Sequence, residues 1–149
     1  MFVKIEKMPG FEVLGMKYRG KNEKNEVPEL WEAFVPRMGE IKNRVDPKTS
    51  YGVMDGFDRE TGEFDYIACV EVTPADEGPS GMVRVMIPDQ TYAVFKSPLS
   101  TIRQVFDYAS REWFPQSGYK RSPGPEFELY GDEFHVDQTI YVYIPLSED

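Results

Sequence analysis

The sequence has 149 residues, of which 40% are hydrophobic and 29% are charged, so it is long enough for one folded domain with its own core. It contains no run of about 18 apolar residues, which excludes a membrane-spanning helix. The 26 acidic residues outnumber the 17 basic ones and give a formal net charge of −9. Because nucleic-acid binding needs clustered basic side chains, we expect no direct contact with DNA or RNA.

The N-terminal residues and the cysteine content bear on the cellular location of the protein. Residues 1–7 alternate between polar and apolar side chains, whereas a signal peptide needs a continuous apolar segment. The single cysteine, Cys69, cannot form an intramolecular disulfide. Both features suit a reducing environment, so we expect a cytoplasmic location and no membrane partner.

The first half of the chain predicts two strands, a helix and two further strands. Apolar residues recur every three or four positions from Val27 to Ile41, which indicates a helix that Pro36 kinks or ends early. An acidic turn, 55–65, separates the last two strands. The expected strands are 2–8, 11–19, 51–54 and 64–72.

The second half repeats this order after a Pro/Gly-rich loop at 73–81. Helical spacing predicts a helix that begins after Ser100 as its N-cap and is stopped by Pro115 and Gly118. The expected strands are 82–87, 91–96, 127–130 and 139–145.

The repeated order of elements predicts an α+β fold of two tandem β-α-β-β modules related by a pseudo-twofold axis. The repeat covers roughly 1–74 and 81–146 within a single domain, 1–149. We expect one curved antiparallel sheet with both helices on the same side. The junction between the modules is a natural place for a central ligand cleft.

Motifs for nucleotide binding, serine hydrolysis and zinc proteolysis do not occur in the sequence. With one histidine, His135, and one cysteine, the chain cannot assemble a zinc site or a Cys/His nucleophile by itself. The acidic turn does not match the ligand spacing of an EF-hand. We therefore expect no metal and no cofactor, and we interpret His135 as a surface or hydrogen-bonded loop residue.

Two carboxylates interrupt otherwise apolar strands, Glu71 and Glu128. Each could point to solvent from a half-buried strand, or it could lie at the floor of an aromatic cavity. In the second case the carboxylate would be costly to bury alone, and a lipophilic cation would offset that cost. Strand parity places Tyr130 on the same face as Glu128, which supplies an aromatic wall beside the charge.

Three segments make the chain similar to a known family. The runs Ile87–Phe95, Glu112–Tyr119 and Gly124–Tyr130 resemble the GyrI-like family, which includes the effector-binding domains of many AraC-type and MerR-type transcription activators. Tyr51-Gly52-Val53 and Val70-Glu71-Val72 agree with the same pattern in the first half. The resemblance covers nearly the whole chain, although no helix-turn-helix is present in it.

The resemblance implies a cleft for hydrophobic, often cationic, aromatic molecules. It places the buried glutamate of the family at Glu128 and its tryptophan at Trp113. The remaining candidates for lining the cleft are Tyr18, Tyr66, Tyr130, Tyr141, Tyr143 and Met54.

Two functions remain open at this point. One is a stand-alone binding protein that acts as a sensor, a sequestering protein or the partner of another polypeptide. The other is implied by the resemblance, because some stand-alone members of the family hydrolyse cyclopropane-containing toxins: a hydrolase in which Glu128 is the general base on a water molecule.

Overall fold

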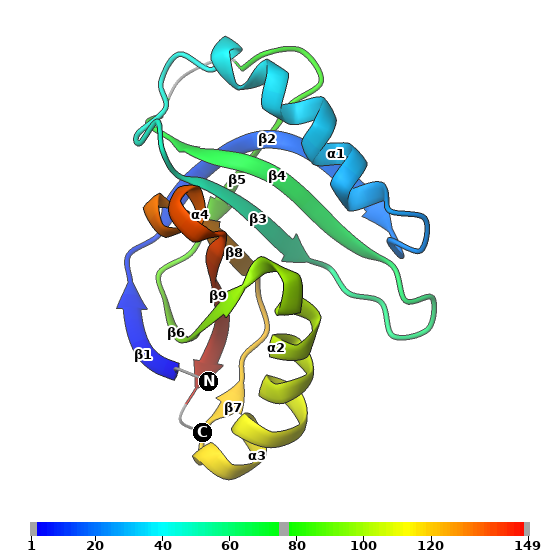
Figure 1. The fold of residues 1–149 in the computed structure, drawn as a ribbon, viewed down its shortest axis with the longest axis vertical. Coiled ribbons are helices and arrows are strands. Elements are labelled where there is room, and N and C mark those ends of the chain that lie inside the picture. Colours follow the sequence, from blue (N-terminus) through cyan, green and yellow to red (C-terminus); the bar gives the residue numbers. More distant parts are fainter. Residues whose placement is uncertain (1–2, 75–77, 148–149) are drawn as a thin grey trace.

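The computed structural model describes residues 3–74 and 78–147, which form an α+β fold with an open antiparallel sheet and two main helices (Figure 1). The strands are β1 (Val3–Met8), β2 (Phe11–Gly20), β3 (Ser50–Asp55), β4 (Phe64–Val72), β5 (Val83–Ile87), β6 (Gln90–Pro98), β7 (Lys120–Arg121), β8 (Glu126–Tyr130) and β9 (Thr139–Ser147). The helices are α1 (Glu26–Phe34), α2 (Ile102–Tyr108), α3 (Phe114–Ser117) and α4 (Asp132–Asp137). Helical turns η1 (Val35–Glu40), η2 (Leu99–Thr101) and η3 (Ala109–Trp113) adjoin them. Within the described ranges, no helix is long and apolar enough to cross a membrane.

The order of the strands confirms the predicted pseudo-twofold arrangement. The sheet runs β1-β6-β9-β8-β3-β4-β2-β5, with β7 added beside β9. From the central β3–β8 pair outward, the first half contributes β3, β4 and β2, and the second half contributes β8, β9 and β6 in the same order. The outermost strands are exchanged, because β1 pairs with β6 and β5 pairs with β2. Each module therefore completes the sheet of the other.

Both helices cover the same face of the sheet, as expected from the repeat. Directly opposed residues in antiparallel strands point to the same side. Gly52 and Val142 both lie opposite Glu128, so all three share one face. On this face α1 packs through Phe34 and α2 packs through Val105, each into its own core cluster. The β3–β8 pair lies between the two clusters, and Figure 1 shows α1 in the upper half of the view and α2 in the lower half.

The opposite face of the sheet is also buried. The rings of Phe127 and Tyr143 stack there with centroids 4.5 Å apart, and Tyr51 and Tyr92 pack edge-on against Phe127. Cys69 lies in the same cluster as a buried free thiol. Because apolar groups fill both faces of the central strands, the sheet is held rigidly beneath the helices.

The ends of the helices differ in part from the sequence prediction. Pro36 ends the first helix early, since α1 stops at Phe34 and continues as a 3₁₀ turn. The expected N-cap at Ser100 is wrong, because Ser100 lies inside a 3₁₀ turn that precedes α2. Pro115 does not stop the second helix either. It follows the π-helical turn η3 and enters the first turn of α3, where the missing N–H is tolerated, and the helix ends at Gly118 with φ of 83°.

Candidate functional site

Glu128 occupies the centre of the face that both helices cover. Its side chain extends from β8 and is 7% exposed. The Oε1 atom accepts hydrogen bonds from the hydroxyl groups of Tyr66, at 2.7 Å, and Tyr130, at 2.8 Å. The Tyr66 hydroxyl in turn accepts a hydrogen bond of 2.9 Å from Nε1 of Trp31 on α1. Strands from both modules and a helix therefore fix the position of one carboxylate.

This arrangement depends on the glycine opposite Glu128. A Cβ atom added at Gly52 would lie 2.0 Å from the Tyr66 hydroxyl oxygen and 2.6 Å from Oε1 of Glu128. Both distances are far below any permitted contact. Because Gly52 has no side chain, the Tyr66 hydroxyl and the Glu128 carboxylate can approach each other and form their hydrogen bond.

Two features of the surroundings of Glu128 change the pKa of its carboxyl group in opposite directions. Burial raises the pKa of the Glu128 carboxyl, whereas the hydrogen bonds from the two tyrosines lower it. Burial and the neighbouring carboxylate raise the pKa values of Tyr66 and Tyr130, so both hydroxyl groups keep their protons and donate. Among the described residues no donor reaches Oε2 of Glu128, and no basic side chain forms an ion pair with it. One oxygen remains available to a ligand.

A cavity of about 780 Å³ lies over this carboxylate between the two helices, and we call it the Glu128 cavity. Its walls are mainly apolar and come from α1, α2, α4 and the central strands. They include Val27, Trp31, Val35, Met38, Met54, Phe64, Tyr66, Leu99, Ile102, Phe106, Glu128, Tyr130 and Phe134. Its volume is within the range of sites that enclose drug-sized molecules.

The short helix α4 contributes Phe134 and His135 to the wall of the Glu128 cavity. His135 lies on this helix and not in a loop, and its Nε2 atom is 2.9 Å from the carbonyl oxygen of Lys48. This contact joins α4 to the segment before β3. His135 is therefore an exposed, hydrogen-bonded residue at the cavity wall.

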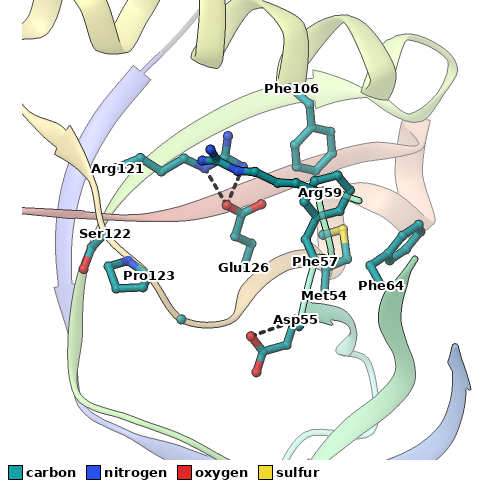
Figure 2. A pocket seen from close by; sticks show the side chains of 12 residues that line it. Met54, Asp55, Phe57, Arg59, Phe64, Phe106, Arg121, Ser122, Pro123 and Glu126 are labelled. Carbon is teal, nitrogen blue, oxygen red and sulfur yellow. Dashed lines mark hydrogen bonds and ion pairs between the residues drawn. The ribbon is translucent and has the colours of Figure 1, made fainter. Parts of the chain in front are cut away.

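A second cavity of about 920 Å³ adjoins the first and shares Met54, Phe64 and Phe106 with it (Figure 2). Its charged groups include Arg121 and Glu126, whose side chains form an ion pair. Although this space is larger, its lining contains no buried unpaired carboxylate comparable with Glu128. The Glu128 cavity is accordingly the stronger candidate for a ligand site.

The structure brings together four of the residues proposed from the sequence. Glu128, Tyr66, Tyr130 and Met54 all line the Glu128 cavity. The hydrogen bond from Tyr130 to Glu128 follows from the strand parity that places both on one face.

The other proposed residues lie elsewhere. Tyr18 donates a hydrogen bond of 2.6 Å to Glu26 at the start of α1 and is outside the cavity lining. Tyr141 and Tyr143 belong to the opposite face, because Val142 between them is the residue opposed to Glu128.

Trp113 requires a correction, because it lines neither cavity. It stacks on Tyr119 and packs edge-on against Phe95, in the core beneath α2. Trp31 is the tryptophan of the cavity. Its place in the apolar stripe of the first helix was visible in the sequence, but the stripe alone does not show that it faces the junction between the modules.

Two pseudo-symmetric modules that enclose an aromatic cavity with a buried carboxylate define a protein domain built to hold a small molecule. The chain belongs to the GyrI-like effector-binding family, since residues 4–146 match the model of the integron-associated effector binding protein, Cass2.

Known proteins of similar sequence and fold agree with this assignment. The transcriptional regulator BrlR of Pseudomonas aeruginosa is 34% identical over 152 residues, and the match covers 98% of this chain and 56% of BrlR. The chain thus spans little more than half the length of that relative. The integron cassette protein of Vibrio cholerae has the same fold, with a TM-score of 0.71, 23% identity and coverage of 97% and 95% of the two chains. SAV2435, solved bound to tetraphenylphosphonium, gives a TM-score of 0.75 at 15% identity, with coverage of 99% and 94%.

Proposed function

We propose that this protein binds hydrophobic aromatic molecules with a positive charge in the Glu128 cavity, and that Glu128 pairs with the charge. The observation that supports this most directly is a carboxylate that is 7% exposed, has one free oxygen and lies at the floor of an apolar cavity. A buried carboxylate without a basic partner is unfavourable, and a bound cation relieves that cost.

The aromatic walls favour the same class of ligand. Trp31 and Tyr130 pack edge-on with ring centroids 5.3 Å apart, and both line the cavity. Rings of this kind attract cations through their π faces and also cover the apolar parts of a ligand. A hydrophobic cation such as the tetraphenylphosphonium bound by SAV2435 has both properties.

We further propose that ligand binding serves to sense or sequester such compounds in the cytoplasm. The regulator BrlR contains a region similar to this chain and has additional length beyond it. For a sensing role, the bound state would have to be communicated to another polypeptide or to a further segment of chain. Sequestration would need the cavity alone.

The test is titration of the protein with tetraphenylphosphonium and with the neutral compound triphenylphosphine oxide. Wild type is expected to bind the cation, and Glu128→Gln is expected to weaken binding by about tenfold to a hundredfold, because the attraction between the carboxylate and a cationic centre about 6 Å away is worth roughly 3 kcal/mol at an effective dielectric constant of about 20. The affinity for the neutral compound should fall much less in Glu128→Gln, because no charge pair is lost. Equal affinity of wild type and Glu128→Gln for the cation would contradict the proposal.

Hydrolysis is the second candidate, and the free Oε2 atom facing a cavity is the feature that favours it. In that case Glu128 would take a proton from a water molecule as the water oxygen bonds to one cyclopropane carbon and a ring C–C bond breaks, and the protonated Glu128 would return the proton to the carbon that is released. Mass spectrometry after incubation with a cyclopropane-containing compound separates the two functions. A hydrolase yields the ring-opened product with the mass of one water added, and a binding protein returns the compound unchanged.

A further inference from the structure

Basic residues outnumber acidic ones in the lining of the Glu128 cavity, whereas acidic residues are in excess over the whole chain. Three basic residues, Arg44, Lys48 and Arg103, line the cavity, and Glu128 is the one acidic residue among its described lining residues. The chain as a whole carries a formal net charge of −9. We call Arg44, Lys48 and Arg103 the basic rim.

Arg44 has unused hydrogen-bonding capacity. A guanidinium group carries five N–H donors. In the described structure Nη2 donates to the carbonyl oxygen of Thr49 at 3.0 Å, Nη1 meets only the weak acceptor Sδ of Met38 at 3.9 Å, and the buried Nε atom has no partner. Burial lowers the pKa of Arg44, whereas the Asp46 carboxylate raises it. Because Nε is shielded from solvent, it is the Nη1 group, whose contact with Met38 is weak, that could donate to an acceptor on a ligand.

Four arginines away from the Glu128 cavity are neutralised by carboxylates, whereas the exposed Arg59 and Arg111 form no ion pair among the described residues. Ion pairs with acidic side chains within 4.0 Å are formed by Arg19, Arg37, Arg84 and Arg121. None of the three residues of the basic rim has such a partner in the described part of the chain. The positive charges of the basic rim are thus not neutralised by an ion pair in the described structure, and the Asp46 carboxylate acts on Arg44 and Lys48 only from a greater distance.

The residues of the basic rim come from two separate segments of the chain. Arg44 and Lys48 belong to the segment before β3, and Arg103 belongs to α2 on the other side of the sheet junction. Lys48 and Arg103 are exposed, so they lie at the opening, whereas Glu128 is buried at the floor. A ligand that fills the cavity meets a buried negative charge at Glu128 and exposed positive charges at Lys48 and Arg103.

We propose that the natural ligand is amphoteric: its apolar cationic body lies at Glu128, and an anionic group such as a carboxylate is held by the basic rim. This inference rests on the proposed function and narrows the class of ligand. A simple cation would leave the positive charges of the rim unpaired and would be repelled by them. A carboxylate would accept a hydrogen bond from the Nη1 group of Arg44, and Lys48 and Arg103 would add attraction at the opening.

The experiment compares two dyes that differ at one group, a rhodamine with a free carboxylate and its methyl ester. Both have the same flat cationic ring system, and fluorescence polarisation measures both affinities at neutral pH. We expect wild type to bind the free carboxylate about tenfold more tightly than the ester, as one charge-assisted hydrogen-bonded contact predicts. In Arg44→Met this ratio is expected to fall to about one, and in Lys48→Met to an intermediate value.

Lys42→Met is the matched control for Lys48→Met. Lys42 lies in the same segment, its ammonium group contacts the carbonyl oxygen of Gly39, and it does not line the cavity. The ratio of the two affinities should be unchanged in this variant. If Arg44→Met fails to fold, Lys48→Met and Arg103→Met carry the test, since both positions are exposed.

The outcomes separate this inference from the proposed function. Wild type that binds the ester as tightly as the acid, with no effect of the rim variants, overturns the amphoteric ligand and leaves cation binding intact. Failure of both rhodamines and of tetraphenylphosphonium to bind overturns the proposed function itself. Fluorescein, which has the carboxylate without the cationic ring system, should bind more weakly than the free-acid rhodamine. Equal binding of fluorescein would show that the rim binds anions without help from Glu128.

Discussion

Gly52→Ala is the substitution that tests the geometry of the site most directly. The added methyl carbon would lie 2.0 Å from the Tyr66 hydroxyl and 2.6 Å from Oε1 of Glu128, so these two groups must separate. The Tyr66 hydroxyl would lose its bond to a carboxylate and the bond from Trp31. Loss of one charged and one neutral hydrogen bond lowers the free energy of unfolding by about 3 kcal/mol.

The expected effect is large enough to measure by thermal unfolding. For a domain of this size, about 3 kcal/mol corresponds to a decrease in melting temperature of about 6–12 °C. The affinity for tetraphenylphosphonium should fall at least about tenfold, because the carboxylate would no longer be held in its present position. Both quantities can be measured on the same protein sample.

Gly39→Ala is the matched control. A methyl group at Gly39 would meet no described atom within 4 Å, and its backbone is not in the left-handed region. This change should leave binding unaltered and should leave stability equal or slightly higher, since alanine reduces the entropy of the unfolded chain. If Gly52→Ala behaved like Gly39→Ala in both assays, the close contact of Gly52, Tyr66 and Glu128 would be refuted.

Three further predictions follow from the site and the charge. Ligand binding should change the fluorescence of Trp31 and not that of Trp113, so the signal is expected to be lost in Trp31→Phe and retained in Trp113→Phe. Without ligand, Glu128→Gln should raise the melting temperature at neutral pH, because the folded-state pKa of Glu128 is raised and its ionised form is the unfavourable one. That gain should shrink as the pH falls toward 4.5, the ordinary pKa of the carboxyl group, where the wild-type side chain also becomes neutral. Finally, a gel-shift titration with duplex DNA should show no salt-sensitive complex, since a net charge of −9 opposes binding to phosphates.

The local pattern of the sequence was sufficient to predict most strands and the pseudo-twofold repeat. Alternation and turn residues mark strands such as 64–72, and Pro36 marks the early end of the first helix. The exchange of β1 and β5 between the modules was not predicted, because strand pairing between distant segments leaves no local periodicity. The short helix α4 was missed for a related reason, since six residues are too few for a helical repeat to be visible.

The contrast between local patterns and the pairing of distant segments also explains which site residues the sequence could identify. Tyr130 could be placed beside Glu128 because strand parity is a local property. Tyr141 and Tyr143 could not be assigned to a face until the register set Val142 opposite Glu128. Choosing between Trp31 and Trp113 required the position of each helix relative to the junction.

The site lies where the symmetry of the fold is broken. The register of β3 and β8 pairs Gly52 with Glu128, and the pairs on either side, such as Ser50 with Tyr130 and Met54 with Glu126, are arranged evenly around it. The outer strands show that Gly52 and Glu128 are equivalent positions: Ala68 and then Met16 follow Gly52 across the sheet, and Val142 and then Phe95 follow Glu128. Met16 comes eight residues after Met8, which pairs with Gln90, and Phe95 comes eight residues after Ile87, which pairs with Phe11. The pseudo-twofold axis therefore passes between Gly52 and Glu128. A symmetric pair of glutamates would place two buried carboxylates against each other, and their repulsion would force one to be protonated. With glycine on one side, a single carboxylate occupies the axis and the other module supplies Tyr66 as its donor. The duplicated sheet thus provides a rigid junction, and the one unequal pair at its centre provides the charge that can select a ligand.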